Sequence, residues 1–185
     1  MKKGIGLKLF LVASIGLVLV ARTGGSAPLA PDKLPEPVAN TFKTMFPNGT
    51  IAKLDVEEED GVMVYDFEFS AGGREKEADI AGDGTMIEST LVVAAKDIPA
   101  PAMKTIKRTA KGAKLGRMEW LETFYELKDG KIIKLPKSEI HYAVEMSRGD
   151  QKAEVFVDPA GKVTEAPEWV SAKPVEPKSE GKTGK

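Results

Sequence analysis

The sequence predicts an α+β fold made of two tandem repeats, each with one helix packed on a four-stranded antiparallel sheet. The main observation is that one pattern occurs twice, at nearly fixed offsets. The segment Tyr65–Ser70 returns as Tyr142–Ser147, 77 residues later, together with the glycines and glutamates that follow it. Leu34-Pro35 is echoed by Ile98-Pro99 at an offset of 64 residues. Because the two offsets differ by 13 residues, the second copy contains an insertion before Tyr142.

The helix of the first copy is predicted from the spacing of its apolar residues. Val38, Phe42 and Phe46 fall on one face of a helix. Pro35 lies where the first turn begins, at a position where its missing N–H costs little, and Pro47 ends the helix. The sequence therefore predicts one amphipathic helix at the start of the repeat.

Four strands are expected after this helix, because alternation of apolar and polar residues replaces the helical spacing. Asp60-Gly61 is a strong signal for a two-residue hairpin turn, and further glycine turns follow at Gly72 and Gly84. The predicted strands cover residues 52–57, 63–70, 78–80 and 85–94. One face of the sheet is expected to pack on the helix, and the other to face water or a partner.

The second copy repeats this order with weaker signals. Ala102, Ile106 and Ala110 have helical spacing, and Gly112 ends the helix. The expected strand regions cover residues 115–127, 132–147 and 153–157, and a last hairpin closes at residue 161. The insertion is expected to lengthen the hairpin whose turn is Asp129-Gly130. The sequence leaves open whether the two copies form one domain or two.

The composition excludes several classes of protein. Lys and Arg number 27 and Asp and Glu number 28, so the formal net charge of −1 offers no basic excess for binding nucleic acid. The chain has no cysteine, which excludes lipidation at an N-terminal cysteine, disulfides and thiolate metal sites. No cofactor is expected.

Residues 1–26 are expected to form a signal peptide. Lys2 and Lys3 precede an uncharged, mostly apolar stretch that is shorter than a membrane span, and retention as an N-terminal anchor is the alternative. After cleavage no membrane span is expected, and the protein is predicted to be periplasmic or secreted by a bacterium. The rest of the chain is predicted to contain a linker (27–33), repeat 1 (34–95), repeat 2 (96–168) and a disordered tail (169–185).

This order of turns and core residues resembles the PepSY-like family, which is related to the fold of the beta-lactamase inhibitor protein. In the first copy the matching residues are Leu34, Pro35, Val38, Phe46, Pro47, Gly49, Tyr65, Glu68, Gly72, Glu77, Ile80, Asp83 and Gly84. In the second copy they are Ile98, Pro99, Tyr142, Glu145, Gly149, Glu154, Val157 and Gly161. The resemblance implies a bacterial envelope or secreted protein with two PepSY-like repeats and no catalysis. PepSY domains are associated with inhibiting or regulating peptidases, so it also suggests a partner of that kind.

The residues themselves offer little for catalysis, and we expect no enzyme and no metal site. His141 is the only histidine, and strand alternation predicts that it is an ordinary surface residue on a charged strand face. No nucleophile elbow and no phosphate-binding loop are present in the sequence. The acidic run Glu57–Asp60 is expected to be a solvated strand end, with Ca²⁺ binding as the alternative. Arg148-Gly149-Asp150 falls in a predicted hairpin turn.

A partner-binding surface is expected where Trp120, Phe124 and Tyr125 crowd one strand region, because exposed aromatic side chains anchor protein interfaces. Burial of all three beneath the long hairpin is the other interpretation. The sequence thus predicts an exported, non-catalytic binding module. We expect it to inhibit or regulate another protein, such as an envelope or secreted peptidase or hydrolase, by steric contact. A small-molecule or Ca²⁺-binding envelope protein is the alternative.

Overall fold

The computed structural model describes residues 33–172, and the predicted order of helices and strands is confirmed. The elements are α1 (Glu36–Met45), β1 (Thr50–Glu59), β2 (Val62–Ala71), β3 (Arg74–Ala81), β4 (Met86–Val92), α2 (Ala100–Ala110), β5 (Lys114–Lys128), β6 (Lys131–Arg148), β7 (Gln151–Val157), β8 (Val163–Glu165) and β9 (Val170–Ser171), with a short 3-10 turn, η2 (Ala95–Asp97), before α2. The predicted signal peptide lies outside the described residues.

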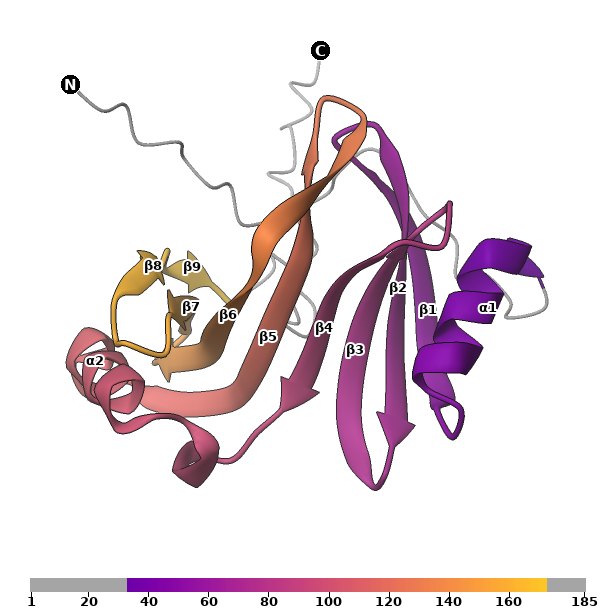
Figure 1. Ribbon diagram of the computed structural model, residues 1–185. Helices are drawn as coiled ribbons and strands as arrows, with labels where there is room; N and C mark the ends of the chain where they lie inside the picture. Colours follow the sequence, from indigo (N-terminus) through magenta and orange to yellow (C-terminus); the bar gives the residue numbers. More distant parts are fainter. Residues whose placement is uncertain (1–32, 173–185) are drawn as a thin grey trace, which may run out of the picture.

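All of the strands belong to one antiparallel sheet. They follow the order β1-β2-β3-β4-β5-β6-β7-β8, and β9 pairs with β7. The last strand of the first copy, β4, pairs with the first strand of the second, β5, over Glu88 to Val92. The two copies therefore share one continuous sheet, and Figure 1 shows α1 at one end of it and α2 at the other.

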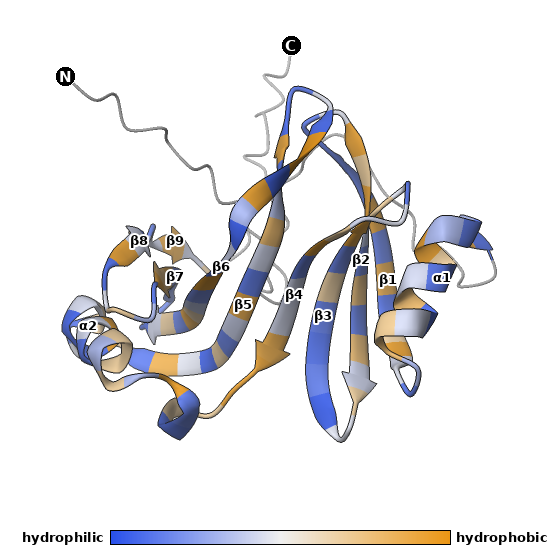
Figure 2. Cartoon of the chain, in the orientation of Figure 1, coloured by the Kyte–Doolittle hydropathy of each residue, from blue (hydrophilic) through white to orange (hydrophobic). Residues whose placement is uncertain are grey.

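Helix α1 packs an aromatic core onto the first half of the sheet. Phe42 stacks on Phe67 of β2, with ring centroids 4.5 Å apart, and Phe46 lies 4.5 Å from Phe69. Val38 is fully buried in the same cluster. These are the residues whose helical and alternating spacing predicted the two elements, and Figure 2 shows that alternation along the strands.

Helix α2 packs a smaller, aliphatic core onto the second half. Ala102 and Ile106 are fully buried against Val144 of β6 and Val155 of β7. The buried side chains of α2 are shorter than those of α1, because alanine stands where α1 has valine and isoleucine where it has phenylalanine.

Each helix is tied to the third turn of its own sheet by the same hydrogen bond. The hydroxyl of Thr41 donates to the carbonyl oxygen of Gly84 at 2.7 Å, and the hydroxyl of Thr105 donates to that of Gly161 at 2.7 Å. Both glycines have positive φ, +89° and +88°, a conformation that favours glycine. This repeated contact shows that equivalent positions of the two copies occupy equivalent places.

The hairpin predicted to carry the insertion is the longest in the sheet, with 15 residues in β5 and 18 in β6. Its turn, Asp129-Gly130, has positive φ at both positions, as does Asp60-Gly61 between β1 and β2, which matches the type I′ turn that their sequences predict. The Gly130 amide donates a 2.6 Å hydrogen bond to the Asp60 carbonyl. The tips of the two hairpins therefore meet, and Figure 1 shows them together at the top of the molecule.

The start of the predicted disordered tail differs from the prediction. Val170 and Ser171 form β9 and pair with β7, and the Ala172 amide donates to the Asp150 carbonyl at 2.6 Å. Trp169 packs against the core of the second half. Residues 173–185 lie outside the described part of the chain. Among residues 33–172 no helix has the length and hydropathy of a membrane span.

Candidate functional site

The sheet has one face that packs on the helices and one that does not, which we call the helix-free face. Alternation and strand register assign each side chain to a face. Leu54, Phe67 and Ala78 are paired across β1, β2 and β3 on the helix-bearing side. Their neighbours in sequence lie on the helix-free face. Its acidic members across β1 to β5 are Asp55, Asp66, Asp79, Glu88, Glu68, Glu75, Glu77 and Glu119, and β6 and β7 add Glu145 and Glu154.

Four of these carboxylates form one row across the first half of the sheet. Asp55 pairs with Asp66, Asp66 with Asp79, and Asp79 with Glu88. Burial raises the pKa of Asp66 to about 7 and that of Glu88 to about 7, and the surrounding carboxylates raise both further, although a hydrogen bond from Thr123 opposes the shift at Glu88. Burial and the same neighbours hold the pKa of Asp79 well above its usual value. The row is therefore partly protonated near neutral pH.

Arg117 is the cation at the centre of this face. It lies in a bulge of β5, where the pairing with β6 shifts between Leu115 and Met118. Its guanidinium donates to Glu77 Oε1 at 2.7 Å, to Glu75 Oε2 at 2.9 Å and to Glu119. Burial nevertheless raises the pKa of Glu119, against the lowering effect of Arg117. Arg117 thus links β5 of the second copy to β3 of the first.

Glu154 of β7 is the most isolated of the acidic residues. Only 7% of its surface is exposed, and its Oε2 has no hydrogen-bond partner among the described residues. Burial raises its pKa to about 8, and Glu119 and Glu145 raise it further. Asp66 has a buried Oδ1 in the same condition. A carboxylate that is buried without a partner is costly, and a cation that reached it would remove that cost.

The prediction that His141 is an ordinary surface residue is wrong. Alternation places it correctly on the helix-free face, opposite Leu121, but only 4% of its surface is exposed. Leu121, Ala143 and Phe156 form a small buried apolar cluster on this face, so the position is not solvated. Burial lowers the pKa of His141, which keeps the imidazole neutral, and its Nδ1 has no partner within residues 33–172.

The three aromatic residues predicted to bind a partner do not form one surface. All three are half-buried. Trp120 pairs with Tyr142 and packs into the core beneath α2. Tyr125 lies two residues before Leu127, which packs with Val64 of β2 on the helix-free side. The distal part of the β5–β6 hairpin therefore covers one end of the helix-free face, and Tyr125 is placed on that side. Their role in partner binding stays a prediction.

The acidic run at the end of β1 is split by the strand. Glu57 and Glu59 lie on one face and Glu58 on the other, since neighbouring side chains of a strand point in opposite directions. In the described part of the chain no three His, Cys, Asp or Glu side chains are placed to hold a metal ion. Arg148-Gly149-Asp150 forms the turn between β6 and β7, as predicted.

The sequence matches no protein-family model and no curated protein. Its fold is similar to those of several solved structures from Bacteroides. A BLIP-like protein of Bacteroides fragilis is 16% identical with a TM-score of 0.53, covering 83% of this chain and 94% of that one. A DUF2874 family protein of Bacteroides ovatus is 17% identical with a TM-score of 0.56, covering 75% and 89%. A protein of Bacteroides eggerthii named "putative periplasmic" is 14% identical with a TM-score of 0.56, covering 75% and 90%. At these identities the likeness shows the fold alone, and the chain has the α+β fold of the BLIP-like proteins.

Proposed function

We propose that the protein is an exported, non-catalytic binding module that docks the helix-free face of its sheet onto a basic segment of another protein. The observation that carries this proposal is the excess of carboxylates on that face, with Glu154 buried and unpartnered among them. Export is supported by the predicted signal peptide, and by the name of a solved relative in fold.

Charge complementarity favours a partner with lysine or arginine side chains. Among the described residues, the cations that form ion pairs with this face are Arg117 in its centre and Lys53 at its edge. A further cation from a partner would approach Asp66 and Glu154, whose raised pKa values fall near neutrality. Binding would then release protons, since a nearby positive charge lowers the pKa of a carboxyl group.

The proposed action on the partner is steric. The sheet is held rigid by the contact between its two hairpin tips, and a flat, rigid face that covers a loop near an active site blocks access without chemistry of its own. An envelope or secreted peptidase or hydrolase is the partner class that the resemblance to PepSY-like domains suggests. The Ca²⁺-binding alternative has no comparable support, because the described acidic side chains do not converge on one point.

The test compares capture of envelope proteins by the wild type and two charge-matched variants. Asp55→Asn/Glu68→Gln removes two charges from accessible positions of the helix-free face, where the side chains are 35% and 44% exposed. Glu36→Gln/Glu58→Gln removes two charges from the first turn of α1 and the helix-bearing side of β1. The bound proteins are identified by mass spectrometry and then tested singly at rising salt.

We expect one basic partner to bind the wild type and the Glu36→Gln/Glu58→Gln control, and to bind the face variant about tenfold more weakly, with salt weakening all three. Equal binding by both variants would remove the helix-free face from consideration. Inhibition of the captured enzyme is then measured directly, and a partner whose activity is unchanged at saturation would contradict the inhibitory role.

A further inference from the structure

The internal repeat shows where the second copy lacks a side chain that the first copy has. The offset of 64 residues that relates Thr41 to Thr105 also relates Phe46 to Ala110. Phe46 follows α1 and packs its ring on Phe69, while Ala110 is the last residue of α2. The Phe-Pro-x-Gly turn of the first copy is replaced at the same place by Lys111-Gly112-Ala113. The ring that closes the helix end in the first copy is thus missing from the second.

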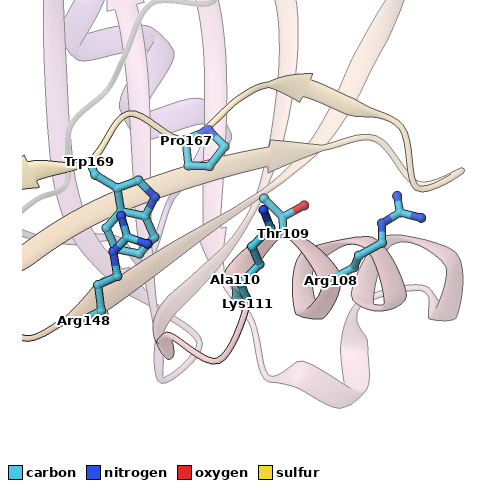
Figure 3. A pocket seen from close by; sticks show the side chains of 7 residues that line it. All are labelled: Arg108, Thr109, Ala110, Lys111, Arg148, Pro167 and Trp169. Carbon is cyan, nitrogen blue, oxygen red and sulfur yellow. The ribbon is translucent and has the colours of Figure 1, made fainter.

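A pocket of about 470 Å³ lies at this place in the second copy. Figure 3 shows its walls, which come from the end of α2, the turn after β6 and the segment before β9. The lining residues are Arg108, Thr109, Ala110, Lys111, Arg148, Pro167 and Trp169. Its volume falls in the range of small-molecule sites, which is roughly 300–1,000 Å³.

The pocket combines an apolar wall with a cationic rim. Trp169, Pro167 and Ala110 supply the apolar surface. The Arg148 guanidinium lies 3.8 Å from the centre of the Trp169 ring, and Figure 3 shows Arg108 at the other side of the pocket. In the first copy the position equivalent to Arg148 is the apolar Ala71, so this charge is particular to the second copy.

The cations of the rim are not neutralised within the described structure. Arg148 donates to the side-chain oxygen of Gln151 at 3.1 Å and Arg108 to the Thr105 hydroxyl at 3.4 Å, and both acceptors are neutral. No carboxylate of residues 33–172 forms an ion pair with Arg108, Lys111 or Arg148. Three cations around an apolar wall form a site of opposite charge to the helix-free face.

We propose that this pocket binds an organic carboxylate whose apolar body is about the size of an aromatic ring. The ring takes the place that Phe46 fills in the first copy and lies between Trp169 and Ala110, and the carboxylate accepts hydrogen bonds from the rim arginines. Such a group occurs at the end of a peptide with an aromatic last residue and in free aromatic acids. The proposal rests on a surface separate from the one that carries the proposed function, so either stands if the other fails.

Binding is measured by the fluorescence of Trp169 in a Trp120→Phe background, where it is the only tryptophan of the chain. Three probes are compared. N-acetyl-phenylalanine represents a peptide end, 3-phenylpropionate a free acid, and N-acetyl-phenylalanine amide lacks the carboxylate. For ligands of this size we expect saturable binding of the acids in the millimolar range and binding of the amide about tenfold weaker. Tighter binding of the first probe than of the second identifies a peptide end as the source, and the reverse a free acid.

Two pocket variants and one control complete the test. Ala110→Phe restores the residue of the first copy, fills the space and is expected to abolish binding at unchanged secondary structure. Arg148→Met keeps an unbranched side chain over Trp169 without its charge, and is expected to weaken the acids about tenfold and the amide little. Lys107→Met removes a charge from an exposed position of the same helix and should change nothing. An unsaturable signal with both acids, equal binding of acid and amide, or unchanged binding in Arg148→Met would each overturn the proposal.

Discussion

Arg117 Nη2 and Glu77 Oε1 are 2.7 Å apart, although they belong to different copies of the repeat and to strands separated by β4. Arg117 also contacts Glu119 on its own strand. Because Glu77 and Glu119 are both buried, this guanidinium offsets the charge of two carboxylates that water does not reach. The side chain therefore links the two halves of the sheet as well as neutralising its helix-free face.

Replacing Arg117 should destabilise the fold. In Arg117→Met the buried Glu77 and Glu119 lose their cation, so we expect the free energy of unfolding at pH 7 to fall by about 3 kcal/mol, measured by urea titration. The control is Lys53→Met, which removes an exposed ion pair with Asp55 and Glu68 and should cost less than about 1 kcal/mol. Equal losses in the two variants would show that Arg117 has no special role.

The stability of the protein should depend on pH through Glu154 in the sense opposite to that of a salt-bridged carboxylate. Its pKa is about 8 in the folded chain and near 4.5 when unfolded, so the folded state holds its proton more tightly. Its contribution is complete below about pH 4.5 and is lost as the pH rises through about 8. We expect Glu154→Gln to be more stable than the wild type at pH 9 by about 2 kcal/mol, with the difference vanishing near pH 5. A difference that does not change with pH would contradict the buried, unpartnered carboxylate.

Two glycines with positive φ should differ in their tolerance of alanine. A Cβ at Gly161 would lie 2.6 Å from the Pro101 carbonyl oxygen, whereas a Cβ at Gly149 would meet nothing within 4 Å. Both substitutions strain the backbone by about 1 kcal/mol, but only Gly161→Ala must also push α2 away from the turn that Thr105 binds. We expect a clearly larger drop in Tm for Gly161→Ala in thermal unfolding. Similar values would mean that the helix shifts freely.

The aromatic residues of β5 should separate into a structural and a surface group. Trp120→Ala removes a side chain packed beneath α2, and we expect a loss of about 2 kcal/mol in the free energy of unfolding. Tyr125→Ala, which changes the hairpin that covers one end of the helix-free face, should leave stability nearly unchanged and weaken capture of the partner. Unaltered capture by Tyr125→Ala would end the prediction that this residue contacts the partner.

The overall order of elements was accessible from sequence because its signals are local. Asp60-Gly61 and Asp129-Gly130 each fix a hairpin through the conformations that these two residues favour, and the spacing of Val38 and Phe42 defines a helix face. The length of the second hairpin follows from the two unequal offsets between the copies. None of these inferences requires knowing which strands pair across the middle of the sheet.

The candidate site was not accessible in the same way, because it depends on contacts between distant strands. Alternation assigns His141 to the correct face, but it does not reveal the buried cluster around Phe156 that removes water from that position. Arg117 lies in a bulge, where alternation fails. The signal for that bulge was Gly116, since a glycine inside a strand often marks one, and a Cβ there would lie 2.9 Å from Glu145 Oε2. The row from Asp66 to Glu88 becomes visible only once the register is known.

The two ends of the strand order have a consequence for how this protein behaves among copies of itself. A sheet whose outermost strand is long and apolar recruits strands from other molecules and aggregates. Here β1 bears Lys53, Asp55 and Glu57 along its length and is kinked by an irregularity between Ile51 and Lys53. At the opposite end β8 has three residues and β9 two, which is too little to template another chain. The molecule therefore stays dispersed when crowded, although its backbone is mostly extended.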